Sequence, residues 1–225
     1  MARILKRLLI IPARGGSKRI INKNIKIFMR KPVIYYAIKE SLKSKLFSKI
    51  HVSTDSNKIF KTVSKIKKNI CFYRPKSLAG DKVPLMEVFK YVVKNYQEEG
   101  IWFKEIWFLN PCSPLIKAVD LNKASRQFKK QKNNSLLSIS KFSPPIEWAF
   151  FKNKNILIPR NKNLQNKSSQ AFKESYYDTG NLGIFSKDIF YKNKKPVFSG
   201  YELPRHRSVD IDTIEDWNLA LKLYG

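Results

Sequence analysis

The sequence predicts an α/β fold with a largely parallel central sheet, because short apolar runs alternate along the chain with longer amphipathic stretches. The apolar runs lie at residues 8–12, 49–54, 70–75, 105–111, 135–140 and 181–185. The stretches with helical spacing are roughly 31–46, 55–67, 84–98 and 118–131. Ligands of such sheets bind at the carboxyl ends of the strands, so the loops there are the first candidates for a functional site.

The first apolar run, LLIIP at 8–12, follows basic residues and superficially resembles a secretion signal. It is far shorter than the roughly 18 apolar residues of a membrane span. Arg-Gly-Gly follows it, where a signal peptide would carry a small-residue cleavage site. The two cysteines, Cys71 and Cys112, are far apart and belong to no CxxC or Cys/His cluster, which fits a reducing compartment. We therefore expect a cytoplasmic protein with no membrane partner.

One domain spanning 1–225 is expected, since 43% of the residues are hydrophobic and can form one packed core. The segment from about 142 to 178 breaks the strand–helix alternation and is rich in Lys, Asn and Pro. We expect an insertion there, either a lid or a dimerisation arm that reaches a partner subunit.

The net charge of +28 invites a nucleic-acid or acidic-membrane interpretation. The basic residues are mostly Lys, however, and they are scattered along the whole chain and interleaved with Asn. An aromatic and basic platform of the kind that binds RNA is absent from the sequence. Most of this charge is expected to be solvated surface, and no nucleic-acid partner is predicted.

The loop after the first run, ARGGSKR followed by NKN, is typical of an anion-binding turn. Gly15 and Gly16 permit the positive-φ turns with which backbone N–H groups approach a phosphate. Arg14 and Lys23 could neutralise the charge of a triphosphate. The loop is neither a Walker A loop nor GxGxxG, and an ordinary turn remains open as an alternative.

The carboxyl-terminal VDID (209–212) alternates as a strand would, which predicts that Asp210 and Asp212 share one face. Thr213 and Asp216 then fit a capping box that opens an amphipathic helix. Paired carboxylates suit Mg²⁺, which accompanies nucleoside triphosphates. Together with the cationic loop they predict nucleotidyl transfer, and a helix cap plus a surface acid is the alternative.

Four motifs in this order, IPARGGSKR..NKN, YRPKSLAGD, FLNPCSP and LPRHRSVDIDTIEDW, resemble the acylneuraminate cytidylyltransferase family over nearly the whole chain. The resemblance implies a Rossmann-like three-layer fold, Mg²⁺ dependence and a homodimer with a small insertion used for dimerisation. The implied reaction joins CTP and a nine-carbon nonulosonic acid at its C2 hydroxyl to give the CMP-sugar and pyrophosphate.

The resemblance also assigns roles to individual residues by motif. The nucleotide-binding positions are Ala13, Arg14, Gly15, Gly16, Ser17, Lys23, Asn24, Arg74 and Asp81. The sugar-binding positions are Asn110, Asp178 and Asn181, and the metal-binding positions are Asp210 and Asp212. Arg14, Lys23 and Asp212 are the catalytic candidates, with Asp212 or a metal-bound water as acceptor of the hydroxyl proton. Cys112 is expected to be a buried small residue, because phosphoryl transfer needs no thiol nucleophile.

The segment YYDTGN at 176–181 stands where sialic-acid enzymes carry a YxxNG-type sequence, and with LPRHR it resembles the pseudaminic acid branch. Sialic or legionaminic acid is the alternative substrate, and a CMP-3-deoxyoctulosonate synthetase is a further one. A basic nucleic-acid-binding protein and a catalytically dead relative are the rivals from other classes.

Overall fold

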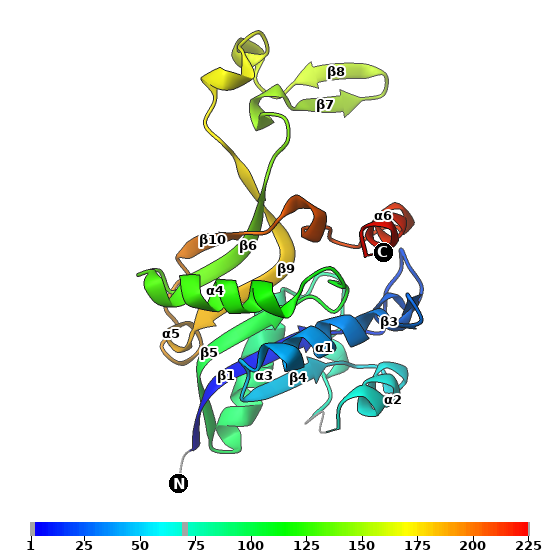
Figure 1. Ribbon diagram of the computed structural model, residues 1–225, viewed down its shortest axis with the longest axis vertical. Coiled ribbons are helices and arrows are strands. Elements are labelled where there is room, and N and C mark those ends of the chain that lie inside the picture. Colours follow the sequence, from blue (N-terminus) through cyan, green and yellow to red (C-terminus); the bar gives the residue numbers. More distant parts are fainter. Residues whose placement is uncertain (1–2, 69–71, 225) are drawn as a thin grey trace.

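A six-stranded sheet forms the body of the computed structural model, which describes residues 3–68 and 72–224, and a long arm rises from it (Figure 1). The strand order is β10-β6-β9-β5-β1-β4. The strands of this sheet are β1 (Arg3–Pro12), β4 (Lys49–Ser53), β5 (Ile101–Leu109), β6 (Ser135–Lys141), β9 (Tyr176–Ser186) and β10 (Phe198–Glu202). Two small hairpins lie outside it, β2 (Ile27–Phe28) with β3 (Lys31–Pro32), and β7 (Phe150–Asn153) with β8 (Ile156–Pro159).

Most pairings within the sheet are parallel. Strand β1 runs parallel to β4 and β5, and β10 runs parallel to β6. Strand β9, which contains the predicted run 181–185, is antiparallel to both of its neighbours, β5 and β6. The prediction of an α/β fold with a mostly parallel sheet is confirmed.

Helices cover both faces of the sheet. They are α1 (Val33–Ser44), α2 (Asn57–Ile66), α3 (Leu85–Glu98), α4 (Ala118–Lys130) and α5 (Lys187–Tyr191). A further helix, α6 (Ile214–Tyr224), packs against Phe28 and Tyr36 beside the sheet. Leu9 and Ile11 pack on the side of α1, α2 and α4, whereas Leu8 and Ile10 pack on the side of α3 and α5. The four consecutive apolar residues of β1, from Leu8 to Ile11, are thus fully buried on two faces, which gives the three layers.

Two predicted strands are wrong. The first two residues of the run 70–75, which include Cys71, lie outside the described residues. Residues 72–75 form no strand. The segment 208–212 also forms no strand, because no neighbouring strand lies beside it. Ile211 is nevertheless fully buried against Trp217 of α6, so the alternation of VDID still turns the two aspartates away from the core. The predicted capping box is confirmed: the amide of Asp216 donates to Thr213 Oγ1 (3.2 Å), and the Asp216 carboxylate accepts from the Thr213 amide (2.7 Å).

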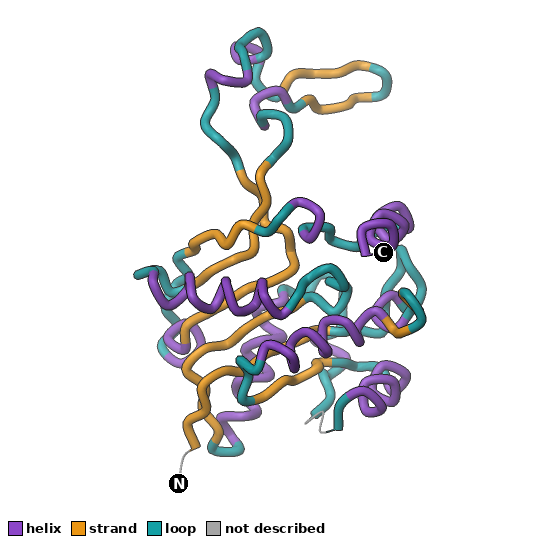
Figure 2. Tube along the Cα trace, viewed as in Figure 1, coloured by secondary structure: helices purple, strands orange, loops and turns teal. Residues whose placement is uncertain are grey.

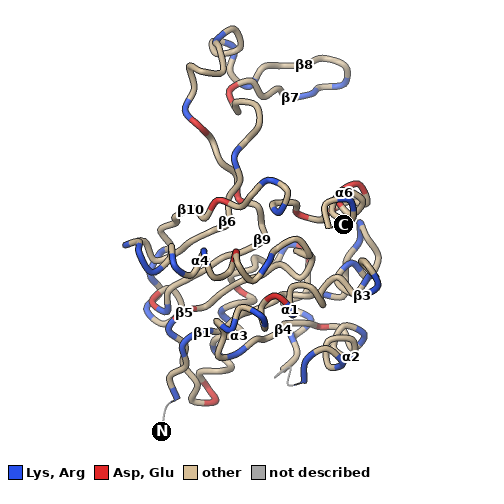
Figure 3. The backbone as a smooth tube through the Cα atoms, viewed as in Figure 1, with Lys and Arg blue, Asp and Glu red and all other residues tan. Residues whose placement is uncertain are grey.

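The arm comprises residues 142–175 and stands on the ends of β6 and β9 (Figure 2). Residues 176–178, which the sequence assigned to the insertion, belong to β9 and pair with β6. The β7–β8 hairpin at its far end leaves apolar side chains open to solvent, with Phe151 at 60% and Ile156 at 67% exposure. Lys and Arg are spread along both body and arm (Figure 3). In the described part of the chain, no helix has the length and apolar character needed to cross a membrane.

Candidate active site

A pocket with about 710 Å³ of empty space, open to solvent, lies at the carboxyl ends of β1 and β5. Its walls come from four places: the loop after β1, the loop that carries Arg74, the exit of β5 at Asn110, and Asp212 before α6. The predicted site residues that line it are Arg14, Ser17, Lys23, Asn24, Arg74, Asn110 and Asp212. Residues almost 200 positions apart in the sequence therefore meet at the edge of the sheet where α/β proteins bind ligands.

The positive-φ turn predicted at the glycines of the loop lies at another residue. Among the described residues, positive φ occurs in this loop at Asn22 (φ 53°) and not at Gly15 or Gly16. A Cβ on Gly15 would lie 2.9 Å from the Cβ of Ser56, and the Gly15 amide donates to Asp55 Oδ1 (2.8 Å). Gly15 is therefore required for the close approach of this loop to the end of β4.

Asn24 fixes the loop from its buried side. It is buried, and its Nδ2 donates to the backbone oxygen of Arg14 (2.9 Å). Its Oδ1 lies 3.3 Å from the Sγ of Cys112, which follows β5. Burial raises the pKa of Cys112 to about 12, so this thiol is a packing residue and not a nucleophile.

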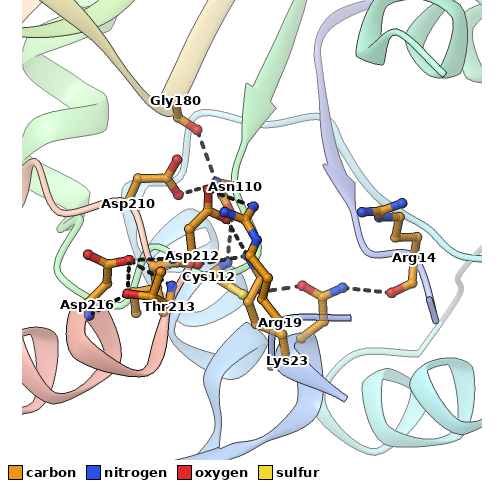
Figure 4. Close-up of polar contacts among 12 residues, drawn as sticks. Arg14, Arg19, Lys23, Asn110, Cys112, Gly180, Asp210, Asp212, Thr213 and Asp216 are labelled. Carbon is orange, nitrogen blue, oxygen red and sulfur yellow. Dashed lines mark hydrogen bonds and ion pairs between the residues drawn. The ribbon is translucent and has the colours of Figure 1, made fainter. Parts of the chain in front are cut away.

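Four cations of the loop point at two carboxylates. Lys23 Nζ lies 3.0 Å from Asp212 Oδ1, and Arg19 lies 2.9 Å from Asp212 Oδ2 (Figure 4). Arg14 and Lys18 both pair with Asp81. Hydrogen bonds from Lys18 and Arg14 hold the pKa of Asp81 below its ordinary value.

The two aspartates before α6 differ in their electrostatics. Desolvation by partial burial, and then the negative charge of Asp212, raise the pKa of Asp210 to about 6. Burial would also raise the pKa of Asp212, but the hydrogen bond and charge of Lys23, together with Arg19, lower it overall. Asn110 Nδ2 reaches Asp210 Oδ1 at 3.3 Å and thereby connects the exit of β5 to this pair.

Arg74 is almost completely buried, and its Nε and Nη2 donate to the side chain and backbone oxygens of Ser53, each at 3.1 Å. Burial lowers the pKa of Arg74 to about 10. The side chain therefore fixes the end of β4 and presents only its edge to the pocket.

The three predicted sugar residues lie in different surroundings. Asn110 lines the pocket. Asp178 accepts from the Gly180 amide (2.8 Å) and lines a second hollow together with Asp210 and Arg205. Asn181 is fully buried, where its side chain accepts from the Ser113 hydroxyl and its backbone oxygen accepts from the Asn110 amide (2.9 Å). It supports Asn110 from within the protein.

Sequence reasoning missed Asp55, which fixes the Gly15 amide. The signal was present, because an acid directly follows the apolar run 49–54 at the carboxyl end of a predicted strand. Lys18 and Arg19, which are not among the predicted site residues, pair with Asp81 and Asp212 respectively.

The donor set fits Mg²⁺ as a half-site. In residues 3–68 and 72–224, no group of three or more His, Cys, Asp or Glu is arranged to hold a metal ion. Asp210 and Asp212 supply two hard oxygen ligands, and Mg²⁺ usually takes one or two carboxylates together with substrate phosphates and water.

Comparisons with known proteins bear on the family and on the fold of the chain. A family model described as cytidylyltransferase matches residues 8–217. The chain is 32% identical over 224 residues to a pseudaminic acid cytidylyltransferase of Campylobacter jejuni, covering 98% of this chain and 97% of the relative. It is 28% identical over 227 residues to a CMP-N,N'-diacetyllegionaminic acid synthase of Legionella pneumophila, with coverage of 96% and 95%. Among solved structures, a CMP:2-keto-3-deoxy-manno-octonic acid synthetase complexed with CTP has the same fold, with a TM-score of 0.70 at 14% identity and 98% coverage of both chains.

Proposed function

Since the chain belongs to the cytidylyltransferase family, we propose that it transfers CMP from CTP to the C2 hydroxyl of a nine-carbon nonulosonic acid and releases pyrophosphate. The observation that carries this proposal is the meeting of the cationic loop with Asp212 across one pocket. A triphosphate needs several positive charges and a metal-binding carboxylate close to its phosphates, and the loop and Asp212 would supply them.

In the proposed reaction the sugar hydroxyl attacks the α-phosphorus of CTP in line with the departing pyrophosphate. The cations of the loop, Arg14, Lys18, Arg19 and Lys23, neutralise charge that accumulates on the phosphate oxygens. Mg²⁺, when bound by Asp210 and Asp212, would supply further neutralisation of the phosphates.

We propose that the hydroxyl proton is accepted by a group other than Asp212, which was one of the candidates from the sequence. Its lowered pKa makes it a weak base, because Lys23 and Arg19 stabilise its charged form. We assign Asp212 to the metal and to the orientation of Lys23, whose Nζ also donates to the Ile211 backbone oxygen (2.7 Å).

Pseudaminic acid is the substrate that we propose within this class, and sialic or legionaminic acid is the alternative. The proposal rests on the segment 176–181 and on the identity of 32% to a pseudaminic acid enzyme against 28% to a legionaminic acid enzyme. Asp178 and Arg205 in the hollow next to Asp210 would face the sugar. On composition, we further propose a cytoplasmic location without nucleic-acid or membrane partners.

Purified protein with CTP and Mg²⁺ tests this function, with pseudaminic, legionaminic and sialic acids offered in parallel. We expect pyrophosphate release with pseudaminic acid at the highest kcat/KM. Turnover of sialic acid alone contradicts the choice of substrate, and the absence of turnover with all three acids contradicts the function.

We also propose that the arm joins two copies of the chain. Phe151 pairs with Ile158 across the β7–β8 hairpin, and both side chains are exposed, although a hairpin of this size is marginal on its own. Lysine at both positions is expected to convert a dimer to a monomer in analytical ultracentrifugation at micromolar concentration. Lys152→Ala, on the other face of the same hairpin, is the matched control, and a monomeric wild-type protein would contradict the proposal.

A further inference from the structure

The segment from Leu203 to Asp212 joins the last strand of the sheet to the two aspartates, and little secondary structure holds it. At one end the Leu203 amide donates to the Ile139 backbone oxygen (2.9 Å), and at the other end Ile211 is fully buried. The middle is a single 3₁₀ turn, Arg205–Arg207, closed by a local bond from the Arg207 amide to the Pro204 oxygen (2.7 Å). The path of this segment towards the aspartates therefore depends in part on what ties its middle to the body.

Arg207 supplies that tie. Its Nη1 lies 3.3 Å from Oδ2 of Asp120, which is fully buried in the first turn of α4. Among the hydrogen bonds and ion pairs of the residues that the structure describes, this ion pair alone joins residues 204–209 to another element. Neither Arg207 nor Asp120 lines the pocket.

Asp120 is itself held firmly. Its Oδ2 accepts from the Lys117 amide (3.0 Å) at the start of α4, and its Oδ1 accepts from the Tyr201 hydroxyl (3.4 Å). A buried carboxylate is costly unless a cation and hydrogen-bond donors surround it, so its partner Arg207 is drawn to a defined position. Helix α4 thus provides a rigid anchor point for the loop that leads to the site.

We propose that Asp120 is a positioning residue for cytidylyl transfer, which acts through Arg207 to fix the loop that presents Asp210 and Asp212 to the phosphates. The inference rests on the proposed function of that site. A shift of about 1 Å in a catalytic geometry can cost on the order of 100-fold in rate, so loss of the anchor is expected to lower kcat. Binding of the nucleotide itself should change little, because the loop after β1 and Arg74 do not depend on this ion pair.

Asp120→Asn and Arg207→Gln test the proposal, with Arg207→Lys as the conservative variant. The matched control is Tyr201→Phe, which removes a hydrogen bond to Asp120 and keeps the ion pair. Both test variants are expected to lower kcat by roughly 10- to 100-fold and to raise KM for CTP by no more than the gain in affinity that Mg²⁺ provides. Arg207→Lys should recover most of the rate, and Tyr201→Phe should match the wild type.

Calorimetric titration of CTP, with Mg²⁺ and with EDTA, gives a readout that does not depend on turnover. Wild-type protein should bind CTP more tightly with Mg²⁺, and the two test variants should lose most of that gain while keeping the wild-type Kd in EDTA. If folded variants keep both kcat and the Mg²⁺-dependent gain, the ion pair only stabilises the fold and the inference is overturned. If wild-type protein shows neither turnover nor a Mg²⁺-dependent gain, the proposed function is overturned, and the inference with it, whatever the variants do.

Discussion

The two ends of the cationic loop after β1, one paired with Asp81 and the other with Asp212, look alike in their charges and differ in how they are built. At each end one carboxylate, Asp81 or Asp212, pairs with two cations of the loop after β1. At the Asp212 end, Lys23 is only 19% exposed and is also bound to a backbone oxygen of the buried Ile211. At the Asp81 end, Lys18 is 81% exposed.

This difference predicts which carboxylate stays in place when a nucleotide binds and which one is displaced. Exposed ion pairs contribute about 0–1 kcal/mol, so phosphate oxygens can displace Asp81 from its cations at little cost. Asp212 is fixed by contacts that reach the core, so it would keep its position when a triphosphate binds. We infer that the Asp212 end does the chemistry, while the Asp81 end holds the cations until nucleotide arrives.

Asp212→Ala is the strongest test of this comparison. The substitution removes one proposed metal ligand and the carboxylate that orients Lys23, so kcat is expected to fall by about 10³-fold. Glu215→Ala, an exposed acid close by on α6, should leave kcat unchanged. Pyrophosphate release checks the rate and circular dichroism checks folding. Wild-type activity in Asp212→Ala would mean that Asp212 has no role in the reaction.

Gly180→Ala tests the same end from the backbone. Gly180 has φ of 64°, and a Cβ there would lie 3.1 Å from Asp210 Oδ2, so alanine would both strain the chain and displace the carboxylate. We expect a roughly 10-fold or greater loss of kcat together with about 1 kcal/mol of stability.

Gly100→Ala is the control for Gly180→Ala. Gly100 has a similar φ of 76°, but no atom lies within 4 Å of its added Cβ, and it is at the start of β5 away from the pocket. Thermal unfolding should show comparable destabilisation in both variants. Equal kcat in both variants would mean that Gly180 serves the fold alone and does not position Asp210.

The sequence could predict the fold class and the residues of each end, but not how the ends are held. The alternation of apolar and amphipathic runs predicts the sheet, and the motifs around Arg14 and Asp212 predict which residues meet. The strand predicted at 209–212 is wrong because a strand requires a neighbour, which periodicity within one segment does not reveal. The Asp120–Arg207 pair joins α4 to the end of the chain and depends on tertiary packing, so no local pattern indicates it.

At low pH, experiments on both ends are limited by the stability of the fold, because His51 of β4 is buried. Burial, and then the charges of Lys49 and Arg74, lower the pKa of His51 to about 3. The unfolded chain takes up a proton near pH 6.5 and the folded chain does not, so stability is lost as the pH falls from about 6.5 towards 3.

The slope from His51 is at most about 1.4 kcal/mol per pH unit. His51→Phe, which keeps an aromatic ring against Phe72 and Tyr96, should flatten the dependence of the unfolding free energy on pH in this range. Urea unfolding of the variant and of the wild type at pH 7 and pH 5 measures this pH dependence. An unchanged slope in the variant would assign the pH dependence to other groups.

The smallest expected effect is also the one that decides what Asp81 does. The family resemblance assigns Asp81 to the nucleotide, whereas the structure places it on Arg14 and Lys18, where a phosphate would compete with it. Asp81→Asn removes the competing charge and should lower KM for CTP by about two- to fivefold, with kcat unchanged, because an exposed pair is worth no more than about 1 kcal/mol. A rise in KM would instead mean that the carboxylate contacts the nucleotide directly. High salt should reduce the difference between variant and wild type, since screening weakens the exposed pairs of Asp81 more than the partly buried Lys23–Asp212 pair.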